Sequence, residues 1–306
     1  MFGRFFYFII LCLVSIANAG EMAVTFDDLP AVRPADVVDA KQITVRLLET
    51  IATEKIPVTA FVNETKLETD GQVDPAMVAL LRMWLDAGLE LGNHTYSHMD
   101  LHQNSLPLFE QDVIRGETVT SELLKQKGKR LRYFRHPYLH TGTDLETKQK
   151  LSAFLSERGY TIAPVSIDNA EWIFALAYDR VDEPTKSKIV DAYIQYMREK
   201  ISFFENESRK LLGRNIRHIL LLHANHLNAD HLPQLIQMIR QKDYRFISLD
   251  EALQDEAYKL PDTFTGRGGI SWIHRWALTR KVEKDFFKGE PEAPPFVMQA
   301  AGVTEE

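Results

Sequence analysis

The stretch AVTFDDLP, residues 23–30, places two adjacent carboxylates, Asp27 and Asp28, at the end of an apolar, β-branched run. Such a run predicts a strand, so the two acids stand where the strand gives way to a loop. Like charges on neighbouring residues repel, and buried charges are costly unless a cation or hydrogen-bond donors compensate them. The stretch therefore indicates either a solvated turn or one edge of a cation site.

Six further strand-like runs follow and alternate with longer segments of helical spacing. This alternation predicts an α/β fold in which about seven parallel strands form a closed or nearly closed sheet with helical crossovers. The strands are expected at residues 22–26, 57–62, 89–92, 131–134, 160–167, 217–222 and 244–249. Helices are expected to include residues 107–126, 144–158, 185–212 and 230–241.

The composition is that of a globular protein with a sizeable core, with 306 residues of which 45% are hydrophobic and 26% charged. The formal net charge is -7, and the chain has no basic stripe. Nucleic acid is therefore not an expected partner.

Residues 1–19 have the layout of a secretory signal peptide. Arg4 precedes an uninterrupted apolar run, and the small residues Ala17 and Ala19 follow it. An uncleaved membrane anchor is the alternative, although the run is short for a membrane span. We expect an exported protein, periplasmic or secreted, with no stable membrane span after cleavage. Because Cys12 is the only cysteine, the mature chain has no thiol, and any metal must be held by nitrogen and oxygen.

Two histidines follow the third predicted strand, in the stretch GNHTYSHMD. His94 and His98 are four residues apart, a spacing that lets both imidazoles face one point. In parallel β/α folds the carboxyl ends of the strands meet at one edge, where Asp27 and Asp28 also lie. The pattern fits a metal site of two histidines and one carboxylate, with surface histidines as the alternative.

The next strands also end in polar groups. The stretch YFRHPYLHTG contains Arg135, which could hold a carboxylate in place, and Pro137 ends the strand before Tyr138. The stretches SIDNAEWIF and ILLLHANH bring further acids and His223 to the same edge. A histidine at the end of a buried strand is more often a core residue than a catalyst, so the interpretation of His223 depends on the other strand-end motifs.

Taken in order, these motifs resemble the polysaccharide deacetylases, the NodB-homology family also called carbohydrate esterase family four. Its signature T-F-D-D, H-x-x-x-H, R-x-P-Y, D-x-x-D-W and L-x-H corresponds to residues 25–28, 94–98, 135–138, 168–172 and 221–223. The resemblance spans roughly residues 21–255. It implies a distorted (β/α) barrel of about seven strands and a NodB-like domain at 20–255. With the signal peptide expected at 1–19, this leaves a C-terminal extension at 256–306 outside the shared domain.

The chain departs from the family pattern in three places. Leu29 and Pro30 follow the first motif where glycine is usual, Glu171 replaces an aspartate, and Ala224 follows the last motif where an acid is common. The extension contains the stretch WIHRW, residues 272–276. Its aromatic rings either offer a surface for a sugar across the barrel mouth or belong to a helix that packs on the barrel exterior.

The resemblance implies one divalent metal ion, held by Asp28, His94 and His98. Zinc is the expected ion because imidazole and carboxylate suit it, with cobalt, nickel or manganese as alternatives. Asp27 is then the general base, and His223 is the general acid.

The resemblance assigns supporting roles to five more residues. Arg135 orients the base, and Glu171 orients and charges the acid. The backbone N–H of Tyr138 stabilises the oxyanion, while Trp172 and Leu221 wall a small apolar pocket for the acetyl methyl group.

These roles imply an exported hydrolase that removes N-acetyl groups from an amino-sugar polymer or oligosaccharide, so the expected partner is an acetylated glycan. The first alternative is hydrolysis of C–N bonds in non-sugar amides or cyclic imides, or of O-acetyl esters, on the same fold. A catalytically silent sugar-binding protein is the second alternative.

Overall fold

The structure is a computed structural model that describes residues 19–305. Residues 1–18, which include Cys12 and nearly all of the expected signal peptide, lie outside the described residues. Among residues 19–305, no helix is both long enough and apolar enough to cross a membrane.

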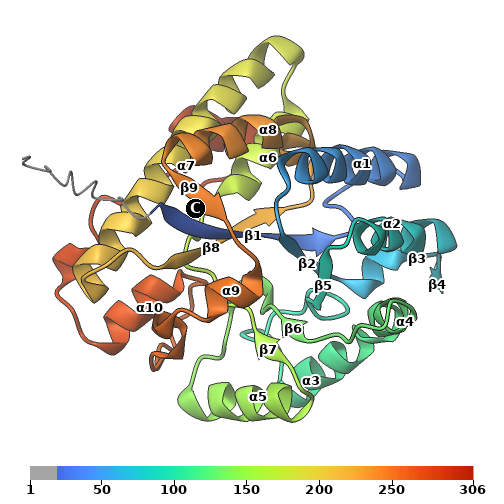
Figure 1. Cartoon of the computed structure of the whole chain (residues 1–306), viewed down its shortest axis with the longest axis horizontal. Helices are drawn as coiled ribbons and strands as arrows, with labels where there is room; N and C mark the ends of the chain where they lie inside the picture. The colour runs from blue at the N-terminus through green and yellow to red at the C-terminus, as the bar shows by residue number, and fades with distance from the viewer. Residues whose placement is uncertain (1–18, 306) are drawn as a thin grey trace, which may run out of the picture.

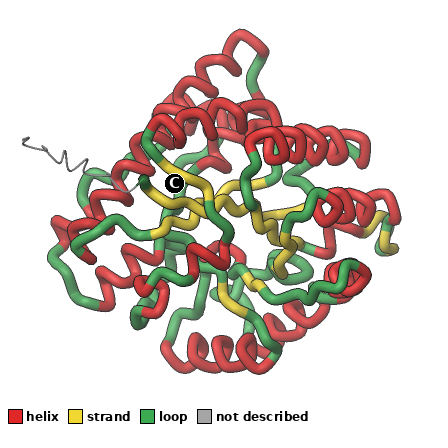
Figure 2. Tube along the Cα trace, in the orientation of Figure 1, coloured by secondary structure: helices red, strands yellow, loops and turns green. Residues whose placement is uncertain are grey.

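A parallel sheet occupies the centre of the protein, and helices surround it (Figures 1 and 2). Its strand order is β7-β6-β5-β2-β1-β8, and β9 also pairs with β1. The prediction of a distorted (β/α) barrel of about seven parallel strands is confirmed. The strands are β1 (Gly20–Leu29), β2 (Val58–Val62), β5 (Glu90–Asn93), β6 (Tyr133–Phe134), β7 (Thr161–Ile162), β8 (Arg217–His223) and β9 (Tyr244–Phe246), with a separate hairpin of β3 (Glu68–Thr69) and β4 (Gln72–Val73).

The sheet curls round until the segment after β7 meets β8. The strand predicted at 160–167 is shorter than expected, because β7 ends at Ile162 and Pro164 has no N–H to donate to a ladder. Parallel pairing resumes further on, where Ile167 bridges to Leu220 of β8. This single bridge brings the two sides of the sheet together, so the carboxyl ends of distant strands face one another.

Two differences from the predicted helices bear on the site. The segment predicted as one helix at 107–126 is two helices that part at Gly116, where a Cβ atom would lie 2.7 Å from the backbone of Thr95 and Tyr96. A helix at 171–180 is additional, and it places Glu171 in its first turn. The helices are α1 (Val37–Glu54), α2 (Pro75–Asp86), α3 (Leu106–Arg115), α4 (Thr118–Gln126), α5 (Leu145–Glu157), α6 (Glu171–Arg180), α7 (Glu183–Leu212), α8 (His226–Gln241), α9 (Leu249–Leu253), α10 (Trp272–Thr279) and α11 (Pro295–Ala301), with short 3-10 turns η1 (Glu64–Leu67), η2 (Pro137–Leu139), η3 (Glu256–Lys259) and η4 (Lys284–Phe287).

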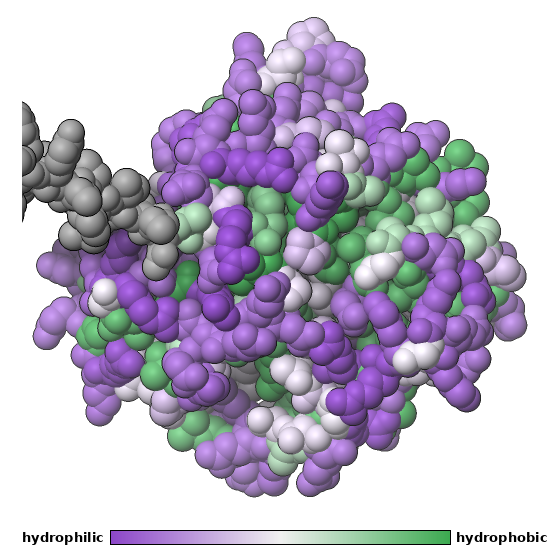
Figure 3. Space-filling view, viewed as in Figure 1, coloured by the Kyte–Doolittle hydropathy of each residue, from purple (hydrophilic) through white to green (hydrophobic). Residues whose placement is uncertain are grey.

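The C-terminal extension shares the main hydrophobic core. Trp276 of α10 and Val297 of α11 are buried in the cluster that also contains Phe26 and Trp84. Trp272 is buried as well, so these rings offer no broad exposed surface to a sugar. On the face seen in Figure 3, hydrophilic residues cover most of the surface and hydrophobic ones show in recesses between them. The extension is therefore an integral part of the packed structure.

Replacement of the buried tryptophan of α10 is expected to destabilise the fold. Trp276 is 1% exposed, whereas Trp172 of α6 is 40% exposed. Trp276→Ala should lower the free energy of unfolding by about 3–5 kcal/mol, because it removes a large buried ring and leaves a cavity. Urea unfolding measures the change, and Trp172→Ala is the control, expected to stay within about 1 kcal/mol of the wild type. Equal losses for both variants would contradict this packing.

Candidate active site

The end of β1 turns both adjacent acids toward the same point. In a regular strand, neighbouring side chains face opposite sides of the sheet. The pairing of β1 with β2 shifts between Phe26 and Leu29, and Asp28 adopts a left-handed φ of 69°. Such a bulge redirects the side chain that follows it. As a result, a carboxylate oxygen of Asp27 lies 3.6 Å from Nε2 of His94, and one of Asp28 lies 3.8 Å from the same atom.

Both predicted histidine ligands meet Asp28 at this point. Nε2 of His98 lies 3.6 Å from Oδ1 of Asp28, and one ligand atom from each of the three residues lies within 4.8 Å of the other two. Nδ1 of His94 donates a hydrogen bond of 2.8 Å to the Arg135 carbonyl, which leaves Nε2 with a free lone pair. Burial lowers the pKa of His94 to about 4, and burial with the neighbouring imidazole lowers the pKa of His98 to about 4. Both rings are therefore neutral near pH 7, as metal ligands must be.

The state of Asp28 also fits a bound cation. Its Oδ1 atom, which faces the two imidazoles, is buried and has no hydrogen-bond partner. Burial opposes ionisation of Asp28, but Lys66 and the two histidines outweigh it and hold the pKa of Asp28 below its usual value. A buried, ionised and unpaired oxygen beside two neutral imidazoles is a donor set for one divalent ion such as zinc, cobalt, nickel or manganese.

Lys66 contacts the other carboxylate oxygen of Asp28, and no sequence motif indicated this lysine. Its ammonium lies 3.3 Å from Oδ2 of Asp28 and donates a hydrogen bond of 3.1 Å to the Asp28 carbonyl. The residue lies in η1, just beyond the carboxyl end of β2. Position at a strand end was therefore the only signal in the sequence that could have found it. Lys66 fixes the rotation of the carboxylate, so that Oδ1 is the atom left for a metal.

Asp27 has different surroundings from its neighbour. The buried guanidinium of Arg135 lies 3.4 Å from Oδ2 of Asp27 and donates a second hydrogen bond, of 3.0 Å, to the Thr25 hydroxyl. Burial raises the pKa of Asp27 although Arg135 acts against it. The two acids thus differ in proton affinity, with Asp27 the more basic and Asp28 the more acidic.

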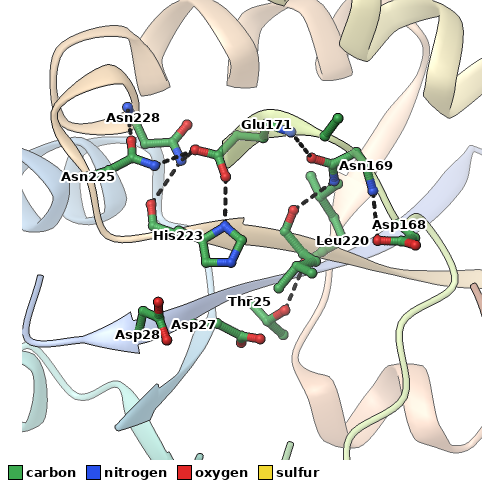
Figure 4. Close-up of polar contacts among 12 residues, drawn as sticks. Thr25, Asp27, Asp28, Asp168, Asn169, Glu171, Leu220, His223, Asn225 and Asn228 are labelled. Atoms are coloured by element: carbon green, nitrogen blue, oxygen red, sulfur yellow. Dashed lines mark hydrogen bonds and ion pairs between the residues drawn. The ribbon is translucent and has the colours of Figure 1, made fainter. Parts of the chain in front are cut away.

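His223 and Glu171 form a hydrogen-bonded pair beside Asp27 and Asp28 (Figure 4). Nδ1 of His223 lies 2.8 Å from Oε2 of Glu171, so the longer side chain at this position still reaches the histidine. Oε1 of Glu171 accepts hydrogen bonds from the amides of Asn225 and Asn228. Burial lowers the pKa of His223, but the hydrogen bond and charge of Glu171 outweigh burial and raise it to about 9. Sequence reasoning missed both asparagines, although their position at the start of α8 directly after His223 could have indicated them.

The three predicted substrate-binding residues occupy different settings. The ring of Tyr138 is exposed and meets the ring of His98 edge-on at 4.4 Å between centroids. Trp172 is exposed in the first turn of α6, next to Glu171. Leu221 is buried in β8, two residues before His223. The ring of Tyr138 thus contacts one of the candidate metal ligands.

A second group of possible ligands lies beyond Tyr138. Asp100, His102 and His140 bring their ligand atoms within 4.8 Å of one another. However, the two imidazole rings are stacked at 3.8 Å with only 7° between their planes. In-plane lone pairs of parallel rings do not converge on one ion, so this arrangement holds loops together rather than a metal.

Comparisons with known proteins support the interpretation of the sequence motifs. Residues 16–154 match the sequence profile of the family described as polysaccharide deacetylase. The resemblance to the polysaccharide deacetylases is confirmed. The chain is also 26% identical, over 155 residues, to a peptidoglycan-N-acetylglucosamine deacetylase of Bacillus cereus. That match covers 51% of this chain and 47% of the relative, so the chain spans about half the length of this curated relative.

Solved structures of the family share the fold. A chitin deacetylase from the fungal pathogen Colletotrichum lindemuthianum aligns with a TM-score of 0.52 and 23% identity over 82% of this chain and 95% of its own. A family 4 carbohydrate esterase pseudoenzyme from Bacillus anthracis aligns with a TM-score of 0.52 and 15% identity, over 78% and 66% of the two chains. The fold therefore occurs in catalysts and in pseudoenzymes, and the site residues must decide between them.

The two adjacent acids are expected to differ in their effect on metal binding. Asp28→Asn should weaken zinc binding at least about 10-fold, since second-sphere changes alone cost 10- to 100-fold. Asp27→Asn should leave the affinity within a few-fold of wild type, because Asp27 contacts Arg135 and is not among the three candidate ligands. Titration calorimetry with zinc measures both variants. Equal losses would show that both acids are ligands.

Loss of the Glu171 carboxylate is expected to lower the pKa of His223. In Glu171→Gln the charge that outweighs burial is gone, so the pKa of His223 should fall from about 9 to below 6.5. NMR titration of the histidine ring protons of the metal-free protein measures the shift. His226 is the internal control, because Asp179 and Asp39 raise its pKa to about 9 independently of Glu171. An unchanged pKa of His223 would contradict the assignment of Glu171 as its partner.

Proposed function

We propose that this protein is an exported, metal-dependent deacetylase that hydrolyses N-acetyl groups of an amino-sugar polymer or oligosaccharide. One observation carries the proposal: a carboxylate that can accept a proton and an imidazole that can donate one lie beside a single cluster of candidate metal ligands. Asp27 and His223 are register partners on the neighbouring strands β1 and β8, and Asp28 is the next residue along β1. The layout of residues 1–19 supports export.

Asp28, His94 and His98 would hold the ion. When bound, a divalent ion there would polarise the substrate carbonyl and make water a stronger acid. Asp27 accepts the proton from the water as the water oxygen bonds to the acetyl carbon. Arg135 keeps the Asp27 carboxylate turned toward the site through their 3.4 Å contact, and the raised pKa of Asp27 makes it a better proton acceptor than Asp28.

His223 completes the reaction from the other side. With its pKa raised to about 9, the ring is protonated near pH 7 and donates a proton to the nitrogen as the C–N bond breaks. An amine leaves poorly unless it is protonated, so this step needs an acid that stays protonated at neutral pH. Glu171 holds the ring through Nδ1 and leaves Nε2 to face the substrate. The products are acetate and a free amine on the sugar.

The substrate carbonyl and methyl group are assigned to the remaining residues. The backbone N–H of Tyr138 donates to the developing oxyanion, a contact whose removal typically costs on the order of 3 kcal/mol. Trp172 and Leu221 wall the pocket for the methyl group. The presence of the whole set, from Asp27 to His223, favours an active enzyme over a silent sugar-binding protein.

Release of acetate from acetylated glycans tests the proposal. The protein should release acetate from chitooligosaccharides or peptidoglycan fragments, lose this activity with a chelator, and regain it when zinc is added. Asp27→Asn should lower turnover by about 100- to 10,000-fold, the usual contribution of a general base. The same variant keeps its metal, so it separates loss of the base from loss of the ion. Hydrolysis of small amides alone, or no hydrolysis by metal-loaded protein, would overturn the proposal.

A further inference from the structure

An arginine of the C-terminal extension grips the loop that carries Tyr138. Arg275 of α10 is buried, and its guanidinium donates to the Leu139 carbonyl and, at 2.7 Å, to the Thr141 hydroxyl. Its Nε donates at 3.0 Å to the carbonyl of Ile270, in its own segment. One rigid fork thus ties the extension to a loop that lies 134 to 136 residues earlier in the chain.

The backbone of the extension also lies directly against this loop. A Cβ atom on Gly269 would be 1.8 Å from the Tyr138 carbonyl oxygen and 3.4 Å from Cβ of Leu139. Glycine is therefore required by the approach of the two backbones. Arg275 and Gly269 together contact both consecutive residues of the loop.

The loop needs such support because its conformation is unfavourable. Tyr138 and Leu139 have φ values of 56° and 54°, in the left-handed region that side-chain-bearing residues rarely adopt. Two such residues in a row persist only where surrounding contacts hold them. On the other side, the loop after β5 contributes the bond from Gly142 N–H to Nε2 of His102. The Tyr138 loop is thus clamped between a barrel loop and the extension.

We propose that Arg275 and Gly269 are positioning residues, which hold the Tyr138 backbone in the conformation that stabilises the oxyanion. The catalytic part of this inference rests on the proposed function, whereas the clamping of the loop does not. The charge of Arg275 is compensated locally, because Asp262 lies 3.6 Å from its guanidinium and the ring of Trp272 stacks 4.2 Å from it. The extension therefore completes the reaction centre without contributing a group that touches the reacting atoms.

Two variants and one control test the proposal in the full-length protein. Arg275→Met removes the fork, and Gly269→Ala pushes on the Tyr138 carbonyl without removing a charge. Arg280→Met is the control, because Arg280 also donates to a backbone carbonyl from the extension but at Leu211, away from the loop. Hydrogen–deuterium exchange of peptides covering 137–142 and 94–98 is measured for each protein, with zinc affinity and steady-state kinetics on an acetylated chitooligosaccharide.

In Arg275→Met and Gly269→Ala, exchange over 137–142 should rise at least about 10-fold, while 94–98 and zinc affinity stay near wild type. Turnover, kcat, should fall about 10- to 100-fold with KM changed less than about 3-fold, since a misplaced oxyanion donor acts in the transition state. Arg280→Met should change none of these. Unchanged exchange would overturn the clamping, and faster exchange with normal kcat would overturn the positioning role. An inactive wild type would overturn the proposed function alone, and the exchange data would still decide the clamping.

Discussion

The site depends on one constraint: two neighbouring acids of a strand must face the same point. A regular strand cannot do this, because its side chains alternate between faces. The bulge at the end of β1 and the left-handed φ of Asp28 remove the alternation, so Asp27 and Asp28 both reach His94. The repulsion between the acids is then compensated on two sides, by Arg135 for the first and by Lys66 for the second.

The surroundings of Asp27, Asp28 and His223 give these three groups different proton affinities. Burial acts on all of them, yet it raises the pKa of Asp27, is outweighed at Asp28, and is reversed at His223 by Glu171. At Asp28 and His223 the charged partners outweigh burial, whereas at Asp27 burial outweighs Arg135. Asn225 and Asn228 support this pair, because they donate hydrogen bonds to Oε1 of Glu171 and leave Oε2 for His223.

The sequence was informative wherever a motif stood at the end of a strand. Alternating apolar runs predicted the parallel sheet, and strand ends predicted that His94 and His98 would meet one of the two adjacent acids. The family resemblance singled out Asp28 as that acid. Contacts between side chains from distant segments leave no pattern in the sequence, as the contact of Lys66 with Asp28 shows. The split at Gly116 and the early end of β7 depend on close backbone approach and on Pro164, which periodicity does not register. The role of the extension was equally hidden, because WIHRW reads as an ordinary amphipathic helix.

The position of Arg275 near the end of the chain has a consequence for the order of synthesis. The ribosome makes the chain from the amino terminus, and domains begin to fold as they emerge. Every motif residue up to His223 is translated well before Gly269 and Arg275. A prematurely terminated product that ends at residue 255 would carry the full set of motif residues around a loop that nothing from the extension holds. The contacts that hold this loop from the extension can therefore form only after translation has passed Arg275.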